Sequence, residues 1–208
     1  GLADIGVKMA QERGMFRSPR LNISVHPLSI TGGHFDFYLN SGFDMEIKYP
    51  GYPSGVCDGV EEVLKKTRQV IRSQADFIKI MASGGVLSTY TSPDYPQFNS
   101  KELATIVNEA KANGLNVVAH CHSLKGMNNC IKAGVKSIEH GTFIDRKTAQ
   151  SIAKKRIYLT PTLVVHHTLI EEGFPSWDNF AKERLKKLEE VVKIQKENIS
   201  IAYEEGVR

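Results

Sequence analysis

Histidines gather at the ends of short apolar segments in this sequence of 208 residues. All but one of the seven histidines lie at or just beyond such a segment, whereas chance would place some within helices as well. Neutral imidazole is a common ligand of zinc and related ions. This clustering therefore favours a metal site or a catalytic site. Its members are His34, His120, His122, His140, His166 and His167, and His26 is the exception.

Lys79 lies within the apolar segment 77–81, where its neighbours must be buried. A fully buried ammonium without a partner is very costly. One interpretation is an ion pair with a carboxylate at the edge of a sheet. A second is a catalytic lysine of lowered pKa that forms Schiff bases. The third is a lysine that has reacted with carbon dioxide to give a carbamate, an anionic oxygen ligand that bridges two metal ions; this requires metal ligands nearby.

His120 and His140 provide such neighbours, because they end two successive predicted strands. Adjacent parallel strands lie roughly 4.8 Å apart, so two imidazoles at their ends can converge on one ion. His122 lies two residues beyond His120 and faces the same side of an extended chain, as a ligand, a substrate contact or a supporting group. We prefer His120 as the ligand because it directly follows the apolar strand. His166 and His167 match no ligand spacing, and we predict a surface role for this pair.

Short apolar runs alternate with helical patterns five times along the chain. Gly114 and Gly134 are suited to end helices, and Ser100 and Asp145 are suited to begin them. This order is typical of an α/β fold with a parallel sheet and helices outside it, in which active sites lie at the carboxyl ends of the strands. The predicted strands are 21–30, 76–81, 116–120, 135–139 and 157–165, and the predicted helices are 60–74, 100–114, 124–133, 145–155 and 178–205, with long loops at 35–59 and 88–99.

Composition excludes several classes of protein. The net charge of +4 is small, and the basic residues near the C-terminus alternate with glutamates, which argues against nucleic-acid binding. No apolar run reaches the roughly 20 residues that cross a membrane. Three scattered cysteines give no disulfide framework, so we expect a reducing compartment, the cytoplasm. Phosphate-binding glycine loops and a GxSxG nucleophile motif are absent. A homo-oligomer is compatible with the sequence.

Five blocks of sequence resemble the amidohydrolase superfamily, and they are closest to its imidazolonepropionase-like and prolidase-like branch. They occur in the order of that family and extend over nearly the whole chain. The resemblance implies a (β/α)8 barrel of the TIM type. The blocks are TGGH (31–34), DFIKIMASGGV (76–86), NVVAHCHS (116–123), AGVKSIEHGT (133–142) and LTPTL (159–163).

The resemblance also implies roles for individual residues. Lys79 matches the carbamylated lysine that bridges two metal ions, and His120 and His140 match the ligands that end the fifth and sixth strands. His34 and His122 match positions that contact substrate. Two tyrosines in the loop after the Lys79 strand either line the substrate pocket or pack the loop; they are Tyr90 and Tyr95.

Two features of the family are missing from this sequence. No HxH pair precedes Lys79, and no aspartate of an eighth strand follows the last helix. The matched blocks correspond approximately to strands three to seven, so we expect one partial barrel domain over residues 1–208, an internal fragment of a longer enzyme. The general-base aspartate is expected downstream, and the fragment by itself is expected to lack a complete site.

For the intact protein we expect a hydrolase that cleaves a C–N bond with a metal-activated water. One or two divalent ions are expected, with zinc as the default for histidine and carboxylate-type ligands. The predicted substrate is small and peptide-like, either a dipeptide or an N-acyl amino acid, with a cyclic amide as the alternative. Two other classes stay open: a Schiff-base barrel enzyme that uses free Lys79, and a binding or assembly module without catalysis.

Overall fold

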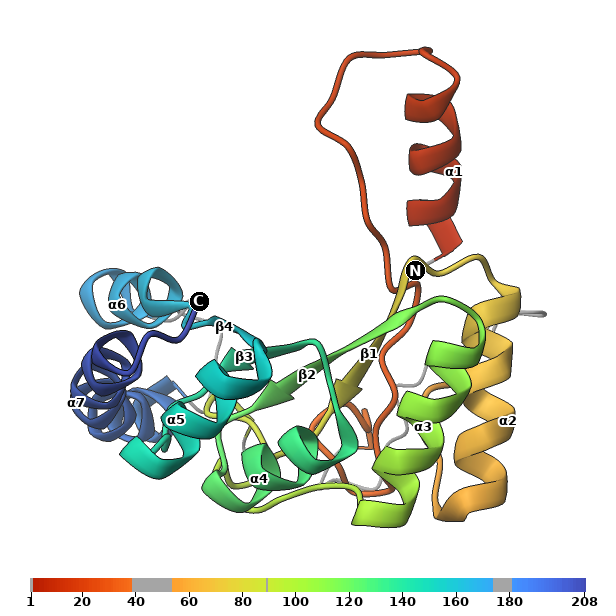
Figure 1. Ribbon diagram of the computed structural model, residues 1–208. Helices are drawn as coiled ribbons and strands as arrows, with labels where there is room; N and C mark the ends of the chain where they lie inside the picture. Colours follow the sequence, from red (N-terminus) through yellow and green to blue (C-terminus); the bar gives the residue numbers. More distant parts are fainter. Residues whose placement is uncertain (1, 39–53, 89, 174–180) are drawn as a thin grey trace.

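A parallel β-sheet of four strands in chain order forms the centre of the computed structural model, which describes residues 2–38, 54–88, 90–173 and 181–208 (Figure 1). Each strand is followed by a helix, and successive helices contact one another to form an outer layer. The predicted α/β alternation is therefore confirmed. The strands are β1 (Phe77–Met81), β2 (Asn116–Cys121), β3 (Ser137–His140) and β4 (Tyr158–Thr160), and the helices of this layer are α2 (Gly59–Arg72), α3 (Ser100–Ala112), α4 (Leu124–Ala133) and α5 (Arg146–Lys155).

Local capping explains where these helices begin and end. The side chain of Asn99 accepts hydrogen bonds from the backbone N–H groups of Lys101 and Glu102, and Glu102 returns a bond to Asn99. This capping box makes Asn99 the cap, one residue before the predicted Ser100, and α3 begins at Ser100. Gly134 ends α4 in the left-handed conformation, and the Asp145 side chain caps α5, both as predicted.

The two faces of the sheet differ in what they contact. Ile78, Ile80 and Ile138 are fully buried in the main core, on the face that the helices cover. Side chains alternate along a strand, so Lys79 and His120 lie on the opposite face. The register places Lys79 beside Val118, and His120 beside Met81 and Glu139. The sheet therefore separates an apolar layer from a polar face.

The predicted strand over 21–30 is wrong. Only two single parallel bridges form there, from Leu28 to Ile80 and from Ser29 to Val56. Pro27 has no N–H to donate to a ladder, and Val25 adopts a positive φ of 60°, so the segment cannot stay extended. Leu28 still lies along β1, since its N–H donates to the carbonyl of Lys79.

The predicted strand over 157–165 is also too long, because β4 ends at Thr160. Pro161 and Thr162 turn the chain, with a φ of 53° at Thr162, and α6 (Leu163–Glu172) begins directly afterwards. α6 packs against α7 (Ala181–Glu204), within the predicted 178–205. Beyond α7 the chain returns to the sheet, where the carbonyl of Arg208 accepts a hydrogen bond from the N–H of Leu159.

α1 (Leu2–Glu12), which the sequence patterns did not indicate, projects away from the sheet (Figure 1). In the described residues no helix is long and apolar enough to cross a membrane. The three cysteines are buried and form no disulfide, and the cellular compartment stays a prediction.

Asp76 ties the start of β1 to two preceding segments. Its carboxylate accepts hydrogen bonds from the Lys8 ammonium and the Ile23 N–H. Burial raises the pKa of Asp76, but these two bonds outweigh burial and lower it overall. A carboxylate whose folded pKa is depressed stabilises the fold above its unfolded pKa of about 4, and this contribution is lost as the pH falls through the folded pKa.

We therefore expect Asp76→Asn to lower the free energy of unfolding by about 1 kcal/mol at pH 7, since its side chain is 26% exposed and the bonds are partly screened. The difference from the unsubstituted chain should shrink below pH 4. Denaturant titrations at pH 7 and pH 3.5 measure both values, and Asp94→Asn, at an exposed position, is the control. A loss that is equal at the two pH values would show that the carboxylate charge contributes nothing.

Candidate metal centre

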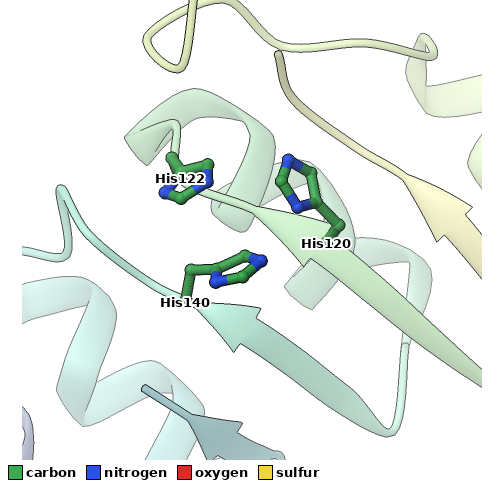
Figure 2. Close-up of side chains that lie close together, drawn as sticks. All are labelled: His120, His122 and His140. Atoms are coloured by element: carbon green, nitrogen blue, oxygen red, sulfur yellow. The ribbon is translucent and has the colours of Figure 1, made fainter. Parts of the chain in front are cut away.

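Three imidazoles meet at the carboxyl ends of β2 and β3. The candidate ligand nitrogens of His120, His122 and His140 all lie within 4.8 Å of one another. The ring centroids of His120 and His140 are 4.7 Å apart, and those of His122 and His140 are 4.5 Å apart with nearly parallel planes. Figure 2 shows the three rings facing a common space from two adjacent strands. We call these three residues the histidine triad.

His140 joins the triad because its backbone departs from the strand. In the register of the sheet it lies beside Cys121, which is fully buried in the apolar core. Strict alternation would direct His140 toward that core with Ile138. Its φ of 76° lies in the left-handed region, which is unfavourable for a residue with a Cβ, and this turn brings its ring to the side of His120. Such strain is typical of functional sites.

Hydrogen bonds determine which ring nitrogen of His120 and of His140 is free to bind a metal ion. The Nε2 of His120 lies 3.1 Å from the carbonyl oxygen of Gly84, which only accepts, so Nε2 carries the proton and Nδ1 is free. The Thr162 hydroxyl donates to the carbonyl of Pro161 and accepts from the Nδ1 of His140 at 2.6 Å, which leaves Nε2 free on His140. The Nδ1 of His122 is bonded to the Thr142 hydroxyl at 2.8 Å.

The surroundings keep these imidazoles neutral. Burial lowers the pKa of His120 and His122 well below the ordinary value near 6.5. Burial, together with the charge of Lys79, lowers the pKa of His140 to about 3. Metal ligation requires unprotonated nitrogen, and histidine is a preferred ligand of zinc, copper, iron and nickel. The donor set is therefore one that a divalent ion fits.

Lys79 lies on the same face of the sheet, half-buried on β1. Burial lowers the pKa of Lys79, and Glu139 partly opposes this. The register places Lys79 on the strand next to that of His120, and its charge contributes to the lowered pKa of His34, His120 and His140. Among the residues that the structure describes, the Lys79 ammonium has neither a hydrogen bond nor an ion pair, and the carboxylate of Glu139 accepts a hydrogen bond from the Ser137 hydroxyl instead. The simple ion-pair interpretation therefore has no contact that supports it.

His34 stacks on His120, with ring centroids 4.4 Å apart. Burial, with the charges of Lys187 and Lys79, lowers the pKa of His34 to about 4. Its Nδ1 is buried without a hydrogen-bond partner in the described part of the chain. Gly85 packs directly against the ring, since a Cβ there would come within 2.0 Å of it. The ring is thus held beside the triad with one polar atom unused.

The two tyrosines predicted to line the substrate pocket differ. The Tyr90 hydroxyl donates to the carbonyl of His34 at 3.4 Å, so its side chain lies next to the site. Tyr95 is 72% exposed, and the structure does not bring its ring into the cluster. Its backbone carbonyl instead accepts a hydrogen bond from the N–H of Gly84, which shapes the loop after β1.

The surface role predicted for His166 and His167, which both lie on α6, is wrong for His166. His167 is exposed and pairs with Glu171. His166 is only 4% exposed, and its ring centroid lies 6.1 Å from that of His140 and 6.3 Å from that of His122. Successive residues on a helix point in directions about 100° apart, so one can be buried while the next is exposed. The sequence pattern places these two histidines just beyond a strand over 157–165 and does not indicate α6, so it cannot distinguish the buried member from the exposed one.

Comparison with known proteins agrees with this architecture. The amidohydrolase family matches residues 7–208. The chain belongs to the amidohydrolase family. It is 35% identical to ochratoxinase of Aspergillus niger over 201 residues, which cover 90% of this chain and 41% of that protein. The crystal structure of that ochratoxinase superposes with a TM-score of 0.85 at 32% identity and covers 97% of this chain and 48% of that one.

Prolidase-like structures are similar to the same extent. A Xaa-Pro dipeptidase with methionine bound in its active site has 34% identity to this chain and a TM-score of 0.86. The superposition covers all of this chain and 51% of the dipeptidase chain. A prolidase complexed with N-methylphosphonate-L-proline has 32% identity and a TM-score of 0.84. The fold is thus part of a TIM-type amidohydrolase barrel, as predicted, and the chain spans about half the length of these relatives. The assignment to strands three to seven stays a prediction.

The Thr162 hydroxyl should tune metal binding by this amidohydrolase chain, because it holds the Nδ1 of His140 and leaves Nε2 free. Groups that orient ligand histidines typically contribute 10- to 100-fold in metal affinity. We expect Thr162→Val to weaken Co²⁺ binding by about that factor in calorimetric titrations.

Thr162→Ser keeps the hydroxyl and should bind Co²⁺ like the unsubstituted chain. Thr105→Val removes an exposed hydroxyl that also bonds a backbone carbonyl, and it should have no effect on affinity. Equal affinity of the Thr162→Val and Thr162→Ser variants would show that this hydroxyl does not orient a ligand.

Proposed function

We propose that this chain carries part of the metal site of a hydrolase that cleaves a C–N amide or peptide bond. The observation that supports this best is the histidine triad, three buried neutral imidazoles whose candidate ligand nitrogens lie within 4.8 Å of one another. A structural core has little use for such a group, since buried polar atoms are costly unless they are paired. Membership of the amidohydrolase family supports the reaction class.

His120 and His140 are proposed as the ligands, through the nitrogens that their hydrogen bonds leave free. These residues would hold a divalent ion, with zinc as the default, which would supply a water of lowered pKa and polarise the carbonyl of the scissile bond. Lys79 is proposed as a carbamate formed with carbon dioxide, which adds anionic oxygen beside the two histidines and allows one or two ions to be held. His122 belongs to the same cluster of nitrogens as the two proposed ligands. We propose it as a third ligand or as a substrate contact.

His34 and Tyr90 are proposed to contact the substrate. The unused Nδ1 of His34 is available to a polar group of the ligand, and stacking on His120 fixes the orientation of the ring. We infer a dipeptide or an N-acyl amino acid as the substrate class, and a cyclic amide as the alternative. The similarity to a Xaa-Pro dipeptidase and to ochratoxinase supports the first choice.

The Schiff-base alternative finds some support in the lowered pKa of Lys79, because an amine must be neutral to attack a carbonyl. The neighbouring histidine triad opposes it, since that chemistry requires no metal ligands. A binding module without catalysis would not explain why three imidazoles are buried together in the triad. Metal binding therefore separates the proposed function from both alternatives.

We expect the chain to bind zinc through the triad. His120→Ala and His140→Ala should each weaken zinc binding at least 100-fold in competition with a chromophoric chelator, because each removes one of few ligands. His167→Ala, which removes an exposed histidine, is the matched control and should bind normally. If all three variants and the unsubstituted chain bind zinc equally, the triad is not a metal site.

Lys79 should carry a carbamate when zinc is bound. With ¹³C-labelled bicarbonate, a carbamate carbon resonance should appear in the zinc-loaded chain and be absent from Lys79→Ala. Lys136→Ala, which removes an exposed lysine from the turn just before β3, is the control and should keep the resonance. Absence of the resonance together with borohydride trapping of a carbonyl compound on Lys79 would instead favour the Schiff-base enzyme.

A further inference from the structure

His166 borders the site although it belongs to neither strand that carries the triad. It lies on α6, one turn after the break at Pro161 and Thr162 that ends β4. Its ring is nearly parallel to those of His140 and His122, with interplanar angles of 22° and 28°. Its ligand atoms are not part of the group within 4.8 Å that defines the triad. His166 is therefore a neighbour of the triad and not a fourth member.

Gln195 on α7 fixes how His166 presents its nitrogens. The Gln195 side chain is fully buried, and its Nε2 donates to the carbonyls of Pro161 at 2.8 Å and His140 at 3.3 Å. Carbonyls only accept, so the amide cannot be turned round. Its Oε1 therefore faces the Nδ1 of His166 at 2.7 Å and accepts a hydrogen bond from it. Nδ1 therefore carries a proton, and in the neutral imidazole Nε2 then carries the lone pair.

That lone pair has no hydrogen-bond partner among the residues that the structure describes, although the side chain is only 4% exposed. The Nε2 atom is not one of the described side-chain atoms that are fully enclosed without a partner, so it can be reached by a donor from the space beside the ring. A small cavity of about 260 Å³ adjoins the ring, and its lining combines three aliphatic side chains with two histidines, one glutamine and one lysine. Besides His166 and Gln195, it is lined by Leu163, Val164, His167, Val192 and Lys196.

We propose that His166 is a ligand-contacting residue of the site, and that Gln195 is the positioning residue that holds it in the Nδ1–H tautomer. The Nε2 of His166 accepts a hydrogen bond from an N–H group of the molecule bound beside the triad, the amino group of a dipeptide. This inference rests on the proposed function for the identity of the ligand, whereas the tautomer depends on the protein alone.

The tautomer is tested in the metal-free chain at neutral pH by long-range ¹H–¹⁵N NMR of the imidazoles. The signals of His166 are identified by their loss in His166→Phe, and those of His167 by their loss in His167→Phe. We expect His166 to show a protonated Nδ1 and an unprotonated Nε2, and Gln195→Met to abolish this preference. A proton on Nε2, alone or on both nitrogens, would overturn the proposal.

The contact is tested by calorimetry with two probe ligands, methionyl-proline and its analogue without the amino group. In the zinc-loaded chain, His166→Phe should weaken binding of methionyl-proline about 5- to 10-fold, the usual contribution of one hydrogen bond. Binding of the analogue should change less than about twofold, since it has no N–H to donate. His167→Phe is the matched control and should affect neither ligand.

A purely structural role of His166 predicts a different result, in which the substitution weakens both ligands equally or neither. Either outcome would overturn the proposed contact. If the chain binds zinc through the triad but does not bind methionyl-proline, the contact is wrong and the metal site stands. If zinc does not bind while His166 shows the expected tautomer, the proposed function fails and the positioning by Gln195 stands.

Discussion

The parallel register between β2 and β3 is the constraint on which the candidate site depends. It places His120 beside Glu139 and Cys121 beside His140, and the apolar layer under the helices holds it there. A slip of one residue would exchange the faces of every side chain and expose Ile138, so burial of the core also fixes the polar face. The site is therefore stabilised by residues that take no part in its chemistry.

The register alone would not assemble the triad, because it directs His140 toward the core. The positive φ of His140 reverses that direction at a cost of about 1–2 kcal/mol. Hydrogen bonds to the end of β3 retain this conformation, with the Thr162 hydroxyl on the ring and the Gln195 amide on the carbonyl. Strain at the functional position is thus held by the segments around it.

α7 connects parts of the site that are far apart in the sequence. Gln195 holds the ends of β3 and β4 and the ring of His166. About two helical turns earlier on α7, the Lys187 ammonium donates to the carbonyls of Gly85, Ser88 and Thr91 in the loop after β1. That loop also supplies the carbonyl of Gly84 to His120. One helix therefore positions the surroundings of most of the histidines.

The sequence is sufficient to predict the four strands β1 to β4 and the helices α2 to α5 and α7 in their order, with polar residues at the strand ends, although it indicates neither α1 nor α6 and adds a strand over 21–30. These follow from local rules, since periodicity, capping residues and glycine turns act over a few positions. The same rules placed Lys79, His120 and His140 at one edge of the sheet, and the resemblance to amidohydrolases depended on the same blocks.

Only the tertiary structure decided which side chains meet. The turn at His140, the burial of His166 and the exposure of Tyr95 depend on backbone angles and on α7, which lies far away in the sequence. The predicted strand over 21–30 does not form, because Pro27 and the positive φ of Val25 interrupt the extended chain. The free nitrogen of each imidazole depends on a partner elsewhere in the chain, Gly84, Thr162 or Gln195. Local propensity carries no information about such partners, because packing selects them only when the whole chain has folded.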